Sequence, residues 1–161
     1  MNGPVVRTDV IDVYVFRRRP APEVLQLRRS RAPFVGDWHT VMGHIEAGER
    51  AVATAVREIA EEIGLSPTHP AFVSLSQLEQ TFPFFLADRN EVMLSPRFAA
   101  EVSAEFVPTL NDEHDDWRWV PVSEPERFIW PGQRHALAEI VQIILPAGAS
   151  ADALRLLPAS T

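Results

Sequence analysis

Residues 43–65 constrain this chain more than any other stretch, because they combine the pattern of an amphipathic helix with glycines and acidic residues at fixed distances. The helix also carries Glu58, Glu61 and Glu62 at positions i, i+3 and i+4, on a face well away from its apolar stripe. The apolar face of the helix is expected to pack on a core, while the acidic face is expected to bind a ligand. The stripe has the helical period and consists of Val52, Ala55, Val56, Ile59 and Ile63.

The three clustered carboxylates predict a metal site. Ionised carboxylates this close repel one another unless a counter-charge lies among them. Oxygen-only ligands select a hard divalent ion such as Mg²⁺, with Mn²⁺ as the alternative, and Mg²⁺ is usually completed by water and substrate phosphate. A solvated surface helix is the competing interpretation, but it gives no role to Gly43, Gly48 and Glu49 at their fixed offsets.

The order of residues in this stretch resembles the signature of the Nudix hydrolases, at Gly43, Glu49, Arg57, Glu58, Ile59, Glu61, Glu62, Gly64 and Leu65. The resemblance implies Mg²⁺-dependent hydrolysis of a phosphoanhydride bond, with Glu58, Glu61 and Glu62 as ligands and Arg57 orienting a catalytic glutamate by a salt bridge. Gly43 belongs to the expected metal site because a glycine lets the loop backbone approach the ion.

Composition narrows the class of protein. The chain has 161 residues, enough for one domain with a core, and no apolar stretch long enough to span a bilayer. The first residues lack the pattern of an export signal, so a cytoplasmic location is expected. A net charge of −7 argues against binding long nucleic acid, although a small anionic substrate brought in by metal remains possible.

Periodicity gives a coarse map of the elements. We expect helices at residues 50–63 and 133–145, the second ended by Pro146. Expected strands, the first two forming a hairpin, lie at residues 10–16, 23–27, 38–42, 71–82, 91–100 and 117–122.

This order of elements permits an α/β or an α+β fold. The resemblance, over about residues 8–146, implies the narrower expectation of the α/β Nudix fold, an α/β/α sandwich with a central mixed β-sheet and a loop-helix-loop catalytic motif. We predict a single domain over residues 1–146. The Ala-rich residues 147–161 are predicted to form a short flexible tail.

Residues outside the signature are similar to the dihydroneopterin triphosphate pyrophosphatases, a group also described as dATP pyrophosphohydrolases. The similar residues are 38–49, 111–119, Trp130, Gln133 and Arg134, although the chain lacks the proline that many Nudix members have before Gly43. The Glu-His-x-x-x-x-Trp element at residues 113–119 also occurs in asymmetric diadenosine tetraphosphate hydrolases, which are the second candidates. A nucleotide-sensing Nudix domain without catalysis is the alternative from another class, disfavoured by the intact glutamates.

The same groups imply further site residues. In both, an acidic residue before the last strand reaches the metal, and Glu113 is the candidate here, with Asp112, Asp115 and Asp116 as competitors. Either Glu58 or Glu113 is the expected general base. The substrate is a small nucleotide or pterin polyphosphate, and a homodimer is expected because dimers are common for this fold. Predicted substrate contacts, for which core packing or plain surface is the alternative, are Arg29, Arg31, Trp38, His44, Phe84, Trp130 and Arg134.

Overall fold

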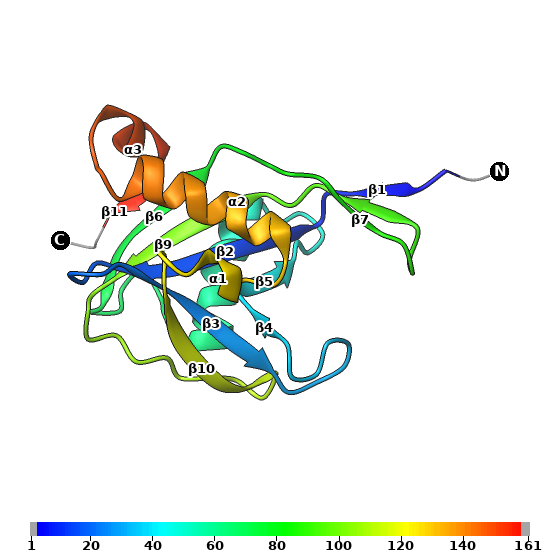
Figure 1. Cartoon of the computed structure of the whole chain (residues 1–161), viewed down its shortest axis with the longest axis horizontal. Helices are drawn as coiled ribbons and strands as arrows, with labels where there is room; N and C mark the ends of the chain where they lie inside the picture. The colour runs from blue at the N-terminus through cyan, green and yellow to red at the C-terminus, as the bar shows by residue number, and fades with distance from the viewer. Residues whose placement is uncertain (1–2, 159–161) are drawn as a thin grey trace.

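The computed structural model of the chain describes residues 3–158 and shows a mixed sheet between two helical layers (Figure 1). The helical elements are α1 (Ala51–Ile63), the 3₁₀ turn η1 (Pro125–Arg127), α2 (Pro131–Glu139), the π-helical segment η2 (Ile140–Ile144) and α3 (Ala149–Leu154). The strands of the main sheet are β2 (Val10–Arg17), β3 (Glu23–Arg29), β4 (Trp38–His39), β5 (Val41–His44), β6 (Phe72–Leu78), β9 (Arg97–Val102), β10 (His114–Pro121) and β11 (Arg155–Pro158).

Six of the eight strands follow one another in the order β10-β3-β2-β9-β6-β11, while β4 pairs with β3 and β5 pairs with β2. All pairs are antiparallel except β2 and β9, which run parallel, so the sheet is mixed. None of the helices within residues 3–158 is long and apolar enough to cross a membrane.

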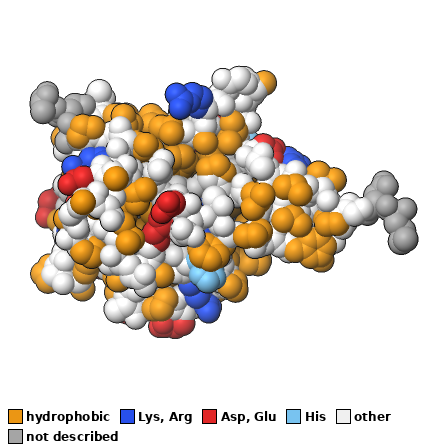
Figure 2. Space-filling view, turned by 90° about the horizontal axis from the view of Figure 1, so that it is seen from above, with side chains coloured by type: hydrophobic (Ala, Val, Ile, Leu, Met, Phe, Trp, Pro, Cys, Tyr) orange, Lys and Arg blue, Asp and Glu red, His pale blue; other side chains and the backbone are white. Residues whose placement is uncertain are grey.

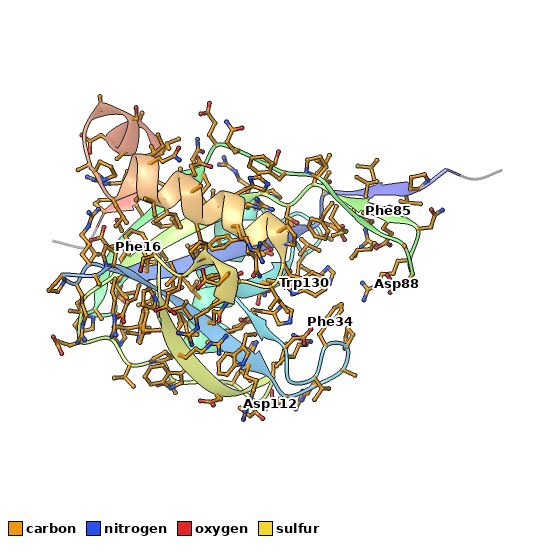
Figure 3. The ribbon with its side chains drawn as sticks, in the orientation of Figure 1. Phe16, Phe34, Phe85, Asp88, Asp112 and Trp130 are labelled. Carbon is orange, nitrogen blue, oxygen red and sulfur yellow. The ribbon has the colours of Figure 1, made fainter. Side chains whose placement is uncertain are left out.

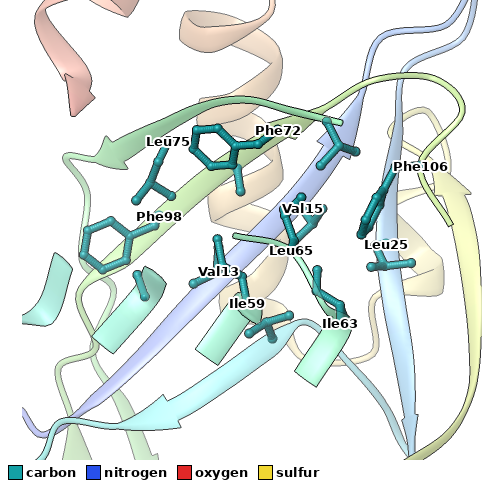
Figure 4. Packing of buried hydrophobic residues seen from close by; sticks show 14 of the residues in the cluster. Val13, Val15, Leu25, Ile59, Ile63, Leu65, Phe72, Leu75, Phe98 and Phe106 are labelled. Atoms are coloured by element: carbon teal, nitrogen blue, oxygen red, sulfur yellow. The ribbon is translucent and has the colours of Figure 1, made fainter. Parts of the chain in front are cut away.

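Strand β2 divides the interior into two cores, because successive side chains of a strand point to opposite faces. Val13 and Val15 pack with α1, whereas Tyr14 and Phe16 pack with α2 and η2. The first core is shown in Figure 4, where the apolar stripe of α1 meets β2. The predicted α/β/α sandwich is confirmed.

Helix α1 begins and ends almost where its pattern predicts. Ala55, Ile59 and Ile63 are fully buried, as the apolar stripe requires. Gly64 ends the helix with a φ of 71°, and its N–H donates to the carbonyl of Ala60. A left-handed residue here favours glycine because it has no Cβ.

The segment between α1 and β10 differs from the two long strands that were predicted. It contains four strands. The first predicted run ends early, at Leu78, where the Glu139 carboxylate accepts from the N–H groups of Glu79 and Gln80. The second run is interrupted at Pro96, which lacks the N–H needed to continue a ladder. The added strands β7 (Phe84–Leu86) and β8 (Glu91–Met93) form a separate sheet with β1 (Val5–Arg7). This sheet extends from the body beside the N-terminus (Figure 1), where hydrophobic side chains gather at the surface (Figure 2).

The predicted flexible tail was wrong for its described part, up to residue 158. Residues after Gly148 form α3 and then β11, which pairs antiparallel with β6 at the edge of the main sheet. Leu156 and Leu157 pack against the core of α1, which explains why this Ala-rich segment folds. Residues 159–161 lie outside the described chain.

Candidate active site

The acidic face of α1 lies against the loop that precedes the helix. Glu58 is only 9% exposed, and its carboxyl group rests on the backbone of Gly43. A Cβ at residue 43 would lie 2.1 Å from both Cδ and Oε1 of Glu58. Glycine is required here by close approach, since no other side chain leaves room for the carboxyl group.

Arg57 ties this loop to the helix. Its Nε and Nη2 donate to the Glu49 carboxylate at 3.1 and 3.0 Å, and Nη2 also donates to the carbonyl of His44 at 2.9 Å. Nη1 donates to Glu58 at 2.7 Å and to Glu61 at 3.3 Å. The hydrogen bonds from Arg57 and Thr54 lower the pKa of Glu49 to about 2. Arg57 is therefore placed to fix the orientation of the acidic residues around it.

Glu62 lies deeper, at 4% exposure, and its Oε2 has no hydrogen-bond partner. Burial, and then the charges of Glu58 and Glu113, raise the pKa of Glu62 to about 9. Nε2 of His114 lies 4.0 Å from Glu62 Oε2. Burial lowers the pKa of His114 to about 4, so this imidazole is neutral at pH 7 and offers no counter-charge. With a pKa of about 9, Glu62 is protonated at pH 7, and a cation could take the place of this proton.

The carboxylate oxygens of Glu58, Glu61 and Glu62 fit an ion that needs few protein ligands. Among residues 3–158, no group of three or more histidine or acidic side chains is arranged so that it could hold a metal ion. Arg57 draws Glu58 and Glu61 toward itself, and Glu61 remains 56% exposed at its side chain. An oxygen-only, open arrangement suits Mg²⁺, which keeps waters and takes phosphate oxygens from the substrate.

Glu113 reaches the same region from the loop before β10. Burial is the main cause that raises the pKa of Glu58 and of Glu62, and the charge of Glu113 adds to the rise in both. Arg29 donates to Glu113 at 3.2 Å and also acts on Glu62, so the structure brings both residues to the carboxylates of α1.

The competing acidic residues pair elsewhere. Asp115 and Asp116 lie 2.7 and 3.8 Å from Arg28. Asp112 pairs with the exposed Arg31, which was a predicted phosphate contact. The structure therefore favours Glu113 over its three neighbours.

Two aromatic side chains from distant loops face one another near α2. Trp130, the residue before α2, is 40% exposed and meets the ring of Phe34 edge-on at 6.1 Å (Figure 3). Phe34 also contacts His39, whose Nε2 is buried and has no partner. Sequence reasoning missed Phe34 and His39. The sequence signal that could have found Phe34 is an aromatic side chain in a loop between two strands. In the structure Phe34 also has a left-handed φ of 70°, which is uncommon for a bulky residue.

The remaining predicted contacts are spread over the surface. The ring of Trp38 faces the guanidinium of Arg118 at 4.1 Å, and Phe84 belongs to the separate sheet. Arg134 donates to the carbonyl of Phe128 at 2.9 Å. His44 is exposed, with Nδ1 3.9 Å from Asp9. The structure does not bring these four side chains together with the acidic cluster.

The sequence profile of the NUDIX domain matches residues 6–140. The chain belongs to the Nudix hydrolase family. It is 34% identical over 137 residues to the octanoyltransferase of Myxococcus xanthus. The alignment covers 83% of this chain but only 36% of that protein.

Other relatives of this Nudix hydrolase carry names of the pyrophosphohydrolase type. It is 25% identical over 121 residues to the RNA pyrophosphohydrolase of Pseudoalteromonas atlantica, covering 68% of this chain and 70% of that one. It is 31% identical over 105 residues to the dihydroneopterin triphosphate diphosphatase of Haemophilus influenzae, and this alignment covers 60% of this chain and 64% of that one. Among solved structures, an Ap4A hydrolase binary complex from C. elegans has a TM-score of 0.71 at 18% identity, covering 88% of this chain and 100% of that chain. The Nudix fold and the resemblance to the dihydroneopterin triphosphate group are confirmed.

Proposed function

We propose that this protein is a Mg²⁺-dependent pyrophosphohydrolase that cleaves a phosphoanhydride bond of a nucleoside or pterin triphosphate and releases pyrophosphate. The observation that carries the proposal is the buried, unpartnered Oε2 of Glu62, beside Glu58 and within reach of the charge of Glu113. With a pKa of about 9 the Glu62 carboxyl group carries a proton at pH 7, and a divalent cation bound there would replace that proton and neutralise the ionised carboxylates. The names of two pyrophosphohydrolase relatives support the same reaction type.

The carboxylates of Glu58, Glu61, Glu62 and Glu113, with the backbone of Gly43, would hold the metal. A bound divalent ion supplies charge neutralisation on phosphate oxygens and lowers the pKa of a bound water. Arg57 occupies Oε1 of Glu58 and leaves Oε2 to accept a proton from the attacking water, so Glu58 is our first choice as general base. Glu113 is the second choice, because its side chain is 41% exposed and its ion pair with Arg29 is the only one that it forms within residues 3–158.

Trp130 and Phe34 are the proposed contacts for the substrate heterocycle. A flat heterocycle stacks on an aromatic plane whatever its identity, and these two exposed rings lie at the start of α2 and in the loop before β4. Arg29, beside Glu113, is placed to meet phosphate oxygens. Retention of the whole acidic group favours an enzyme over a nucleotide sensor.

The second candidate function is asymmetric hydrolysis of diadenosine tetraphosphate. The Glu-His-x-x-x-x-Trp element at residues 113–119 supports it, together with the 4.0 Å between His114 Nε2 and Glu62 Oε2 and the effect of the Glu113 charge on the pKa of Glu62. The location in the cytoplasm and the homodimer stay predictions.

A substrate panel tests the proposal: dihydroneopterin triphosphate, dATP, dGTP and diadenosine tetraphosphate, each with Mg²⁺ and with a chelator, scored by product. Pyrophosphate from a triphosphate supports the first function, while ATP plus AMP from the tetraphosphate supports the second. Glu62→Gln is expected to lower kcat by at least about two orders of magnitude. The exposed Glu105→Gln serves as the matched control and should retain the wild-type rate. An unchanged rate in Glu62→Gln would remove the assigned cluster from the reaction.

A further inference from the structure

The loop before β10 is joined to the C-terminal end of α1 by Asn111. The backbone N–H of Asn111 donates to the carbonyl of Glu62 at 3.3 Å, and its side-chain oxygen Oδ1 accepts from the backbone N–H of Glu113 at 3.2 Å. The same Oδ1 lies 3.3 Å from Nδ1 of the His114 ring. Asn111 therefore links Glu62, Glu113 and His114, and none of the steps proposed above uses it.

The backbone N–H of Glu113 determines which way the amide group of Asn111 is turned. An N–H group only donates, so the amide atom that faces it must be the oxygen and not the NH₂ group. This oxygen only accepts, so Nδ1 of His114, which faces the same oxygen, must carry a hydrogen. The hydrogen bond made by one ring nitrogen sets the tautomer of a neutral histidine. His114 is therefore held in the Nδ1–H tautomer.

The other ring nitrogen of His114 faces Glu62. Nε2 lies 4.0 Å from Glu62 Oε2, and both side chains are buried, with exposed fractions of 3% and 5%. In a neutral ring with its hydrogen on Nδ1, Nε2 is an acceptor, as is a carboxylate oxygen. Only a hydrogen from the Glu62 carboxyl group or from a water can join these two atoms. An ionised Glu62 therefore receives no hydrogen bond from this imidazole.

The opposite tautomer would change the metal site. A hydrogen on Nε2 would turn a donor toward Glu62 Oε2, and a hydrogen bond to a carboxylate stabilises its ionised form. A cation would then have to displace this donor before it could use the oxygen. The tautomer of His114 thus affects metal affinity while every carboxylate stays in place.

We propose that Asn111 is a positioning residue of the metal site, which locks His114 in the Nδ1–H tautomer and so keeps Oε2 of Glu62 free for the cation. In this role His114 accepts a hydrogen bond from a water beside the metal and supplies no proton to the reaction. The proposal rests on the hydrolase function proposed above, because it concerns the metal site of that enzyme.

Nitrogen-15 NMR of the imidazole rings tests the tautomer in the metal-free wild type. A two-bond ¹H–¹⁵N correlation spectrum at neutral pH shows which ring nitrogen carries the hydrogen, and the spectrum of His114→Gln identifies the signals of His114. His114 is expected to show the Nδ1–H form alone. The exposed ring of His44 serves as the internal reference for exchange between both tautomers. A hydrogen on Nε2 of His114, or a ring averaged like that of His44, would overturn the proposal.

Two variants then test whether Asn111 sets the tautomer. Asn111→Leu replaces the amide with an apolar group of similar size, and it should release the Nδ1–H tautomer and weaken the binding of Mn²⁺ alone by about tenfold. Ser30→Ala is the matched control, because Ser30 Oγ donates at 2.8 Å to the carbonyl of Asp112 in the same loop. It should keep both the tautomer and the Mn²⁺ affinity. An unchanged tautomer and affinity in Asn111→Leu would contradict the assignment.

The dependence of turnover on Mg²⁺ separates this role from a catalytic one. Asn111→Leu should need about tenfold more Mg²⁺ for half-maximal turnover, and excess Mg²⁺ should restore kcat, because the variant loses metal affinity but no reacting group. A kcat that stays low at saturating Mg²⁺ would contradict the role of a positioning residue.

The outcomes for the two proposals differ. A locked Nδ1–H tautomer, with Mn²⁺ binding weakened in Asn111→Leu but no hydrolysis of any triphosphate, would leave this inference standing and contradict the proposed function. Mg²⁺-dependent hydrolysis by a protein whose His114 carries its hydrogen on Nε2 would do the reverse.

Discussion

Replacing Gly43 with alanine tests whether the loop backbone sets the position of Glu58. The added Cβ would lie 2.1 Å from Cδ and Oε1 of Glu58, whereas real Cβ contacts are essentially never shorter than 3.0 Å. The carboxyl group must therefore move by at least 3.0 − 2.1 = 0.9 Å. Arg57 holds the same carboxylate at 2.7 Å, so this movement also disturbs the ion pair.

The expected loss of activity follows from this displacement. A misplacement of about 1 Å costs on the order of 10²-fold in rate, which corresponds to about 2.7 kcal/mol of transition-state stabilisation. Stability should change much less, because residue 43 is not in the left-handed region and the far end of a glutamate can rotate away. A change within about 1 kcal/mol, or a few degrees in Tm, is expected.

The assay compares kcat/KM and Tm for wild type, Gly43→Ala and Gly3→Ala. Gly3→Ala is the matched control, since a Cβ there meets no atom within 4 Å. If Gly43→Ala keeps kcat/KM within about threefold of wild type while folding normally, the contact with Glu58 does not matter for the reaction.

Three further predictions concern Arg57, the helix cap at Gly64 and the buried ion pair of Asp12 with Arg97. Arg57→Ala should lower kcat by about 10- to 100-fold with little loss of secondary structure, because Glu49, Glu58 and Glu61 lose their shared donor; unchanged kcat would contradict this role. Gly64→Ala should lower the free energy of unfolding by about 1 kcal/mol or more in urea titrations, since φ is 71° and Thr109 lies 3.2 Å from the new Cβ; a stabilised variant would refute the cap. Burial raises the pKa of Asp12 to about 6 against 3.8, so the folded state binds the extra proton and wild type loses stability as pH rises through this window. The stability of wild type relative to Asp12→Asn should fall by up to roughly 3 kcal/mol between pH of about 4 and 7, and a difference independent of pH would contradict the assignment.

The sequence predicts those parts of the fold that local patterns determine. The apolar stripe of α1, its glycine cap and the hairpin of β2 and β3 depend on residues close in the chain, and they were correct. The break at Pro96 is visible in the sequence, whereas the early end of β6 depends on Glu139, which is distant in the chain. Strand β11 was missed because it is stabilised by pairing with β6, a contact between distant residues.

In the candidate site, too, some residues are predictable from local patterns while others depend on contacts between distant parts of the chain. Glu58, Glu61 and Glu62 are related by helical geometry alone, and Arg57 is one turn from Glu61. The contact of Phe34 with Trp130 and the ion pair of Asp12 with Arg97 depend on how loops and strands distant in sequence come together. Asp12 did offer a local signal, because a charged residue inside a run of β-branched and aromatic residues must be buried with a partner or a function.

A divalent cation is expected to bind among the carboxylates that α1 presents, with Glu62 as an essential ligand. Titration with Mn²⁺, followed by electron paramagnetic resonance in the presence of a non-hydrolysable nucleotide analogue, measures this directly. Wild type should bind Mn²⁺ that Mg²⁺ displaces, and Glu62→Gln should weaken binding by at least about tenfold. Equal Mn²⁺ affinity in both proteins, or no binding to wild type, would contradict the account.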